Sequence, residues 1–272
     1  MSEFPIDHEV NVSFVEGGSS AAAKRLKSFI SVALDKYGDL RNHPTEEVTT
    51  GLSPHLHFGH ISGQQIFQAI VDRETWDESK VAEKAKGSAR GWWGMRECAE
   101  SFVDQIVTWR ELGYNMCWQL PNYAEYDSLP DWARRTIREH EKDRREYLYT
   151  LEEFEQSQTH DHLWNAAQRQ LVREGRIHNY LRMLWGKKIY EWTPTGRDAL
   201  EIMIELNNKY ALDGRNPNSY SGIFWILGRY DRAWGPERKI FGKIRYMSSD
   251  NTARKVKVKP YLEKYSGERS LF

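Results

Sequence analysis

Three tryptophans in one stretch of the chain have the type and spacing that electron transfer requires. They are Trp164, Trp185 and Trp192, in a chain of 272 residues that holds 11 tryptophans. Trp185 and Trp192 are seven residues apart, which places them on nearly the same face of one helix, roughly 10 Å apart along its axis. Trp164 belongs to the preceding helix, and a turn at Gly175 predicts that the two helices pack as a hairpin. Indoles at near-contact spacing can pass one electron in short hops, but an aromatic core would show the same spacing, so both interpretations stay open.

A loop with three hydroxyl side chains could hold phosphate. The run TTGLSP offers Thr49, Thr50 and Ser53 directly ahead of a helical pattern. Hydroxyls and flexible backbone N–H groups in such a place favour an anion. A capped turn that binds nothing is the alternative interpretation.

An arginine and two further tryptophans add binding chemistry. Arg182 lies on a mostly apolar helix and needs a carboxylate partner if it is buried, for which Asp213 is the candidate. An exposed Arg182 without a fixed partner is the alternative. Trp109 and Trp225 supply two more flat rings, and aromatic pairs are a means by which proteins hold extruded bases.

The elements that must position these residues are helices. Apolar residues recur at helical spacing, and N-cap residues, such as Ser62 and either Thr159 or Asp161, precede several of the runs. Phe102, Ile106 and Trp109 are expected to form one stripe of a helix. The predicted helices cover residues 21–38, 62–71, 97–114, 129–143, 161–174, 177–192 and 196–214. Only two runs, 241–247 and 255–261, resemble strands, so the sequence predicts an all-α fold.

Composition points to a protein without a membrane span or a disulfide framework. No apolar run approaches ~20 residues, and Cys98 and Cys117 lack metal-ligand spacing, so we expect a cytoplasmic location and a reduced compartment. The net charge is zero, yet Glu237–Phe272 holds ten Lys and Arg against four Asp and Glu, a balance of +6. This tail is either a solvated segment or a surface that faces phosphate.

Several motifs together resemble one family. TTGLSPHLHFGHIS, TWRELGYN, THDHLWNAAQRQLVREGRIHNYLRMLWGKKIYEW and LNNKYALDGRNPNSYSGIFW, followed by FGKIRYM, occur in order between Phe4 and Tyr265. They are similar to the photolyase/cryptochrome family, and most similar to class II cyclobutane pyrimidine dimer photolyases of a bacterial branch. The resemblance implies the family's helical FAD-binding domain, in agreement with the helical pattern.

The resemblance also implies a role for individual residues around FAD. The residues that match FAD contacts are Tyr37, Thr49, Thr50, Leu52, Ser53, Arg110, Asn179, Arg182 and Asp213. Among them, Arg182 would pair with Asp213 beside the flavin. Asn207 matches an asparagine that faces flavin N5, where a hydrogen bond tunes the redox states of the ring.

The same resemblance orders the tryptophans and places the substrate. Trp185 would lie nearest the flavin, Trp164 in the middle and Trp192 at the surface, as a photoreduction chain. The residues that match dimer contacts are Gln105, Trp109, Met183 and Trp225. The implied reaction is light-driven repair of a pyrimidine dimer flipped out of damaged DNA, a base-flipping reaction. One electron passes from reduced, excited flavin to the dimer and returns after the ring splits, and no metal is required.

One residue departs from the family pattern. Class II enzymes carry a glutamate four residues before the matched tryptophan, where this chain has Gln105, preceded by Asp104. Glutamine keeps a donor and an acceptor but supplies neither a proton nor a negative charge. On an α-helix Asp104 would point about 100° away from Gln105. Together with the missing N-terminal domain, the departure favours, as an alternative to repair, a cryptochrome-like flavin photoreceptor that photoreduces without repairing DNA. An inert helical remnant of a truncated gene is the third interpretation.

The domain layout departs as well, because no βαβ pattern precedes Ala21. We expect residues 1–20 to be a former interdomain linker, 21–245 the helical catalytic domain, and 246–272 a basic tail packed on it or extending from it. The chain is then a naturally short member or a fragment, without an antenna chromophore. Apolar surface exposed by the missing domain would favour a homo-oligomer or a separate antenna-domain partner, in a nucleoid-associated protein.

Overall fold

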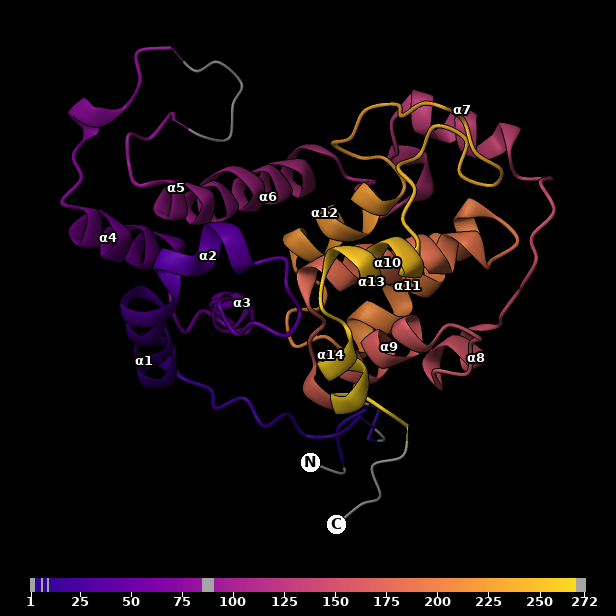
Figure 1. The fold of residues 1–272 in the computed structure, drawn as a ribbon, viewed down its shortest axis with the longest axis horizontal. Coiled ribbons are helices and arrows are strands. Elements are labelled where there is room, and N and C mark those ends of the chain that lie inside the picture. Colours follow the sequence, from indigo (N-terminus) through magenta and orange to yellow (C-terminus); the bar gives the residue numbers. More distant parts are fainter. Residues whose placement is uncertain (1–2, 6, 9, 85–90, 268–272) are drawn as a thin grey trace. The chain divides into compact units, whose positions relative to one another are not determined.

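A computed structural model describes residues 3–5, 7–8, 10–84 and 91–267 (Figure 1). Every regular element in this part of the chain is helical, and its only β-pairing is an isolated antiparallel bridge between Arg238 and Gly242. The prediction of an all-α fold is therefore confirmed. The strand-like interpretation of 241–247 and 255–261 is wrong, because the first run is a turn and the second joins two short helices. No described helix combines the length and apolarity needed to span a bilayer.

The chain divides into two compact units, Val15–Met116 and Met1–Phe14 together with Cys117–Phe272. We call them the N-unit and the C-unit, and each is described by itself. The boundaries predicted at residues 20 and 245 concern the layout of a longer protein and stay predictions. Glu268 and Arg269 of the basic tail lie outside the described residues.

Helices of the N-unit pack around an apolar cluster that includes Phe29, Ile66 and Phe102. Gly38 does not end its helix as expected. It lies inside α2, where a Cβ atom would meet the Cα of Cys98 at an ordinary contact distance of 3.7 Å. Ser62 caps α4 through a reciprocal pair of hydrogen bonds with Gln65, as its position predicted. The helices are α1 (Ser19–Ser28), α2 (Leu34–Leu40), α3 (Ser53–His57), α4 (Gly63–Glu74), α5 (Glu97–Val103) and α6 (Arg110–Gln119), with π-helical turns at Phe29–Ala33 and Asp104–Trp109.

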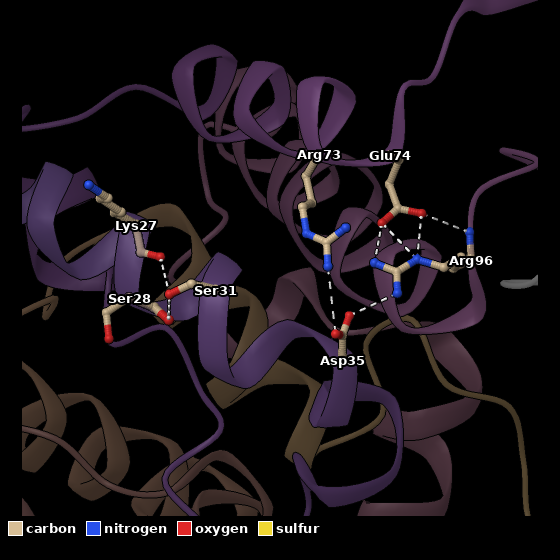
Figure 2. Close-up of polar contacts among 7 residues, drawn as sticks. All are labelled: Lys27, Ser28, Ser31, Asp35, Arg73, Glu74 and Arg96. Carbon is tan, nitrogen blue, oxygen red and sulfur yellow. Dashed lines mark hydrogen bonds and ion pairs between the residues drawn. The ribbon is translucent and has the colours of Figure 1, made fainter.

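Arg96 joins three elements of the N-unit (Figure 2). Its Nη2 lies 2.7 Å from Oε1 of Glu74 at the end of α4, and its Nη1 lies 2.9 Å from Oδ1 of Asp35 in α2. Burial raises the pKa of the Glu74 carboxyl, but the hydrogen bonds from Arg96 outweigh it and the net pKa is lowered. Because Arg96 directly precedes α5, this cluster fixes α5 against α2 and α4 and thereby positions the π-helical turn that follows.

The C-unit is built around α10, which packs against α9, α11 and α12. Asp161, one of the two predicted caps, starts α9 by accepting from the backbone N–H groups of Leu163 and Trp164 at 3.0 Å. Gly175 ends α9 with φ of 64°, as its predicted turn requires. The helices are α7 (Asp131–Glu139), α8 (Leu151–Glu155), α9 (His162–Glu174), α10 (Asn179–Glu191), α11 (Gly196–Tyr210), α12 (Pro217–Ile226), α13 (Ser249–Lys255) and α14 (Lys259–Lys264).

The C-terminal helix α14 is fastened to α9 through Glu174. Its carboxylate accepts a hydrogen bond from Tyr265 Oη at 2.6 Å and lies 3.1 Å from Lys264 Nζ. Burial raises the pKa of the Glu174 carboxyl, but the hydrogen bonds from Tyr265, Arg176 and Lys264 outweigh burial. The net pKa is lowered to about 2. The described part of the basic tail therefore folds onto the C-unit.

Acid should release this contact. A carboxyl with a folded pKa below its unfolded value stabilises the fold fully above the unfolded pKa, and loses that contribution as the pH falls toward the folded pKa. The window is therefore from about 4.5 down to about 2. We expect Glu174→Gln to lower the free energy of unfolding by about 1–2 kcal/mol at neutral pH, after allowance for solvent screening.

Urea unfolding followed by circular dichroism at a series of pH values measures this effect. The curves of the wild type and of Glu174→Gln should converge as the pH falls through the window, whereas Glu263→Gln, an exposed position on α14, should track the wild type throughout. A Glu174→Gln deficit that stays constant down to the acid limit contradicts the assignment.

Candidate functional site

The three predicted tryptophans form a connected, buried file in the C-unit. Trp164 is fully buried, and Trp185 and Trp192 are each 2% exposed. The indole N–H of Trp164 donates to the carbonyl oxygen of Trp185 at 2.9 Å, and its ring centroid lies 6.1 Å from that of Trp192. Trp164 thus touches both of the others. All three indoles belong to the core, and ring contact links Trp164 to Trp192, while Trp164 meets Trp185 at its backbone carbonyl. Membership of the core therefore does not exclude electron transfer.

Trp192 does not lie at the surface as expected. It is the residue that follows α10, and rings from an earlier part of the chain cover it. Its ring centroid lies 5.6 Å from that of Tyr149 and 4.9 Å from that of His160, both edge to face. The burial of Trp192 follows from these long-range contacts, which helical spacing does not reveal.

Polar groups at one side of the file are incompletely bonded within the chain. Arg182 Nη2 lies 3.9 Å from Asp213 Oδ1, and the Nε of Arg182 is buried without a hydrogen-bond partner among the described residues. The side-chain amide of Asn207 is buried, and its hydrogen bond to Oδ1 of Asn208 is long, at 3.5 Å. Buried polar atoms cost free energy unless they find a partner. Arg182 and Asn207 therefore keep hydrogen-bonding capacity that a polar ligand can use.

The other predicted residues of the C-unit lie on the same helices or close to them. Asn179 is the first residue of α10 and is exposed, Met183 follows Arg182 and is half-buried, and Trp225 is half-buried on α12. Arg182 and Trp185 are three residues apart on α10, which makes their side chains neighbours on its surface. The tryptophan file therefore starts beside the unsatisfied Arg182.

The predicted phosphate loop of the N-unit has a cation that the sequence did not indicate. The backbone of Gly51 has φ of 60°, and a Cβ atom there would lie 2.7 Å from Nη1 of Arg25, so the guanidinium rests directly on the loop. Thr49 and Ser53 are exposed, while Thr50 Oγ1 accepts from the backbone N–H of Leu52 at 3.2 Å. Helix α3 has only five residues. Arg25, rather than a helix terminus, therefore supplies the positive charge beside this loop.

Tyr37 is buried in the apolar cluster of the N-unit. Its ring packs edge-on against Phe29 and Phe102, with centroids 5.7 and 5.3 Å away. Burial raises the pKa of Tyr37, and the nearby Arg41 offsets this in part. The phenol stays protonated at neutral pH and can donate a hydrogen bond.

A π-helical turn changes the face that carries the predicted substrate residues. The expected stripe of Phe102, Ile106 and Trp109 assumes an α-helix, but Asp104–Trp109 is π-helical. In a π-helix, residues five apart come into register. The indole N–H of Trp109 accordingly donates to Oδ2 of Asp104 at 2.8 Å, and the Gln105 amide donates to the same oxygen at 3.3 Å. The expectation that Asp104 points away from this site is therefore wrong, because it presumes α-helical geometry.

Arg110 follows the π-helical turn and begins α6. Its guanidinium pairs with Glu111 and lies 4.3 Å from the ring centroid of Tyr114. The predicted N-unit residues thus comprise a loop with a cation, a buried phenol, and a turn where a carboxylate is held beside an indole.

The predicted site residues are divided between the two units. The N-unit carries Tyr37, Thr49, Thr50, Leu52, Ser53, Gln105, Trp109 and Arg110, and the C-unit carries Trp164, Asn179, Arg182, Met183, Trp185, Trp192, Asn207, Asp213 and Trp225.

Known proteins similar to this chain share one name. No protein-family model matches it. Deoxyribodipyrimidine photo-lyase of Methanothermobacter thermautotrophicus is 37% identical over 265 residues, covering 97% of this chain and 54% of the relative. The protein of that name from Potorous tridactylus is 40% identical over 264 residues, covering 96% and 46%. The one from Oryza sativa subsp. japonica is 38% identical over 257 residues, covering 92% and 47%.

Solved structures agree on the fold. A class III photolyase from Agrobacterium tumefaciens has a TM-score of 0.62 at 19% identity, covering 91% of this chain and 44% of that one. A cryptochrome from Synechocystis has a TM-score of 0.66 at 16% identity, covering 97% and 48%. These likenesses show the helical fold that photolyases and cryptochromes share. The chain spans about half the length of the curated relatives it matches, and it belongs to the photolyase/cryptochrome family.

Proposed function

We propose that this chain is the FAD-binding and catalytic module of a class II photolyase, from a bacterial branch, that repairs cyclobutane pyrimidine dimers in DNA. The observation that carries the proposal is the buried group in which the Trp164 indole bonds the backbone carbonyl of Trp185 and packs on the ring of Trp192, beside the incompletely bonded Arg182. The relatives at 37–40% identity, all named photo-lyases, support it.

The residues of this chain have separate roles in the proposed reaction. FAD, when bound, supplies light absorption and the exchange of one electron. Arg182, held by Asp213, and Asn207 orient the ligand through polar groups that otherwise lack good partners. Trp185, Trp164 and Trp192 then supply electrons along a path that excludes water. FAD is the one cofactor that the proposal assigns, and no antenna chromophore is included.

The proposed lesion contacts hold the dimer and set the local charge. Trp109 and Trp225 offer ring faces to the two flipped bases, with Met183 as a soft apolar contact. Asp104 fixes the Trp109 indole through its N–H and turns the Gln105 amide by accepting one of its protons. The carboxylate expected of this subfamily is thus present one residue earlier, because the π-helical turn brings it to Trp109.

A cryptochrome-like photoreceptor is the second candidate, and Gln105 is the observation that favours it. Repair under conditions in which the bound flavin is already fully reduced separates the two. A photolyase then removes dimers under light, whereas a photoreceptor shows light-driven reduction without dimer loss.

The absorption spectrum of the purified chain after incubation with FAD tests the cofactor directly. We expect a yellow protein whose flavin absorption changes under blue light in the presence of an external thiol. A colourless protein that does not take up FAD overturns the proposal.

Loss of either proposed stacking ring should weaken binding of the lesion. Trp109→Ala and Trp225→Ala are each expected to weaken binding of dimer-containing DNA by roughly 1–3 kcal/mol, because each ring stacks on one base. Fluorescence anisotropy with labelled duplexes measures the effect. Undamaged duplex is the matched control, since its bases stay stacked and both variants should bind it like the wild type. Unchanged affinity for damaged DNA in both variants removes these residues from the pocket.

A further inference from the structure

The buried Trp192 needs an electron donor that connects it to the solvent. Trp192 is only 2% exposed, so a reductant in solution cannot reach its ring directly. Besides Trp164, Phe154 and Lys188, the ring of Trp192 contacts those of Tyr149 and His160, at centroid distances of 5.6 and 4.9 Å. Tyr149 is half-buried and His160 is exposed. A phenol is oxidisable, and this one lies directly outside the last indole.

Tyr149 and His160 form a hydrogen-bonded pair with the geometry for proton transfer. Tyr149 Oη lies 2.7 Å from Nδ1 of His160, and the backbone N–H of His160 donates to the same oxygen at 3.0 Å. The backbone N–H occupies one of the two acceptor sites of the hydroxyl. In the tautomer of His160 that carries its proton on Nε2, the phenolic O–H donates to Nδ1. This is the arrangement of an acid and its base at proton-transfer distance.

The pair is held rigidly and reaches solvent. The backbone N–H of Tyr149 donates to the carbonyl oxygen of Trp192 at 3.1 Å, which ties the phenol to the end of the file. On the other side, Thr159 Oγ1 donates to Asn165 at 2.7 Å and anchors the residue before His160. The ring of Tyr147, 39% exposed, stacks on His160 at 3.8 Å. The path from the buried indole to the surface is therefore continuous in contacts.

We propose that Tyr149 is the terminal electron donor of the file and that His160 accepts its proton. The inference rests on the proposed photoreduction by Trp185, Trp164 and Trp192. When the indole of Trp192 is oxidised by one electron, an electron passes to it from the phenol of Tyr149. The phenolic proton passes to Nδ1 of His160, which leaves a neutral phenoxyl radical, an imidazolium and a restored indole.

The cycle closes with an external thiol. The thiol gives one hydrogen atom to the phenoxyl oxygen and becomes a thiyl radical, and the imidazolium releases its proton to water. Charge has then left the buried file, which prevents the electron from returning along it. Without His160, oxidation of the phenol would leave a charged phenol cation half-buried, which is costly.

The test uses radicals formed in the full chain without flavin. A UV flash photoionises tryptophans, and transient absorption and freeze-quench EPR distinguish tryptophanyl from tyrosyl radicals. We expect Tyr149→Phe to remove a part of the tyrosyl signal of the wild type, and Trp192→Phe to remove the same part. The double variant should lose no more than either single one. His160→Gln should slow the formation of this radical about tenfold or more and abolish its slowing in D2O.

Tyr147→Phe, next to the pair but not bonded to the Trp192 backbone, is the matched control and should keep the signal. A tyrosyl yield unchanged in Tyr149→Phe overturns the inference, as does an unchanged rate in His160→Gln. The holoprotein separates this from the proposed function. Light-driven flavin reduction with a long-lived tryptophanyl radical in both the wild type and Tyr149→Phe rejects the role of Tyr149 alone, whereas no light-driven reduction in either rejects the proposed function.

Discussion

Trp185→Phe is expected to slow light-driven reduction of bound FAD by external donors about tenfold or more. Phenylalanine is much harder to oxidise than indole, and Trp185 is the file member nearest to Arg182 on α10. The link from Trp164 to position 185 runs through the backbone carbonyl, so the substitution preserves that hydrogen bond while it removes the oxidisable ring. Absorption of the flavin during blue-light illumination, with a thiol present, measures the rate.

Stability has to be controlled in this experiment because the site is buried. The substitution removes the hydrogen bond from Trp185 Nε1 to Gln168 at 2.8 Å and leaves Gln168 without it, at a cost of about 1–3 kcal/mol. Circular dichroism and FAD affinity show whether the fold persists. Trp132→Phe, a half-buried tryptophan of the C-unit outside the file, should reduce flavin at the wild-type rate. If Trp185→Phe also reduces flavin at the wild-type rate, the three rings only form part of the core and do not carry electrons.

Asp104→Asn is expected to lower light-driven repair at saturating substrate by about ten- to a hundredfold. The carboxylate receives hydrogen bonds from both Trp109 Nε1 and the Gln105 amide. An asparagine removes the negative charge and can present its own N–H₂ group to those donors. Flavin photoreduction should be unaffected, because the tryptophan file lies in the C-unit.

The yield of repaired dimers per absorbed photon, with DNA binding measured in parallel, tests this effect. Asp104→Glu keeps the charge and should retain more activity than the asparagine variant. Gln105→Glu restores the subfamily's usual residue and should not lower repair. If Asp104→Asn repairs dimers at the wild-type level, Asp104 only stabilises the π-helical turn and has no role in repair.

Much of the fold could be predicted from local sequence patterns. Helix ends were predictable because capping depends on the residue type itself. Ser62 and Asp161 cap through their own side chains, and Gly175 through its backbone freedom. The interior of the long helical runs was less predictable. A π-helical turn such as Asp104–Trp109 inserts one residue without a diagnostic residue type, yet it decides that Asp104 faces Trp109.

Other features depend on contacts between distant parts of the chain. Trp192 packs against Tyr149 and His160, and Arg25 reaches the 49–53 loop from α1. The alternating residues of 255–261 resemble a strand, but they end α13 and begin α14 at Lys259, with Val256 and Tyr261 buried. Spacing along the sequence contains none of these contacts.

Dimer loss under blue light tests the central claim most directly. The purified chain, loaded with FAD and chemically reduced without oxygen, is mixed with DNA that contains cyclobutane pyrimidine dimers, and the dimers are counted after illumination and after an equal time in the dark. The account predicts that dimers disappear in the light only, with repeated turnover by each protein molecule. An FAD-loaded, fully reduced protein that binds this DNA yet leaves the dimers intact in the light would contradict it.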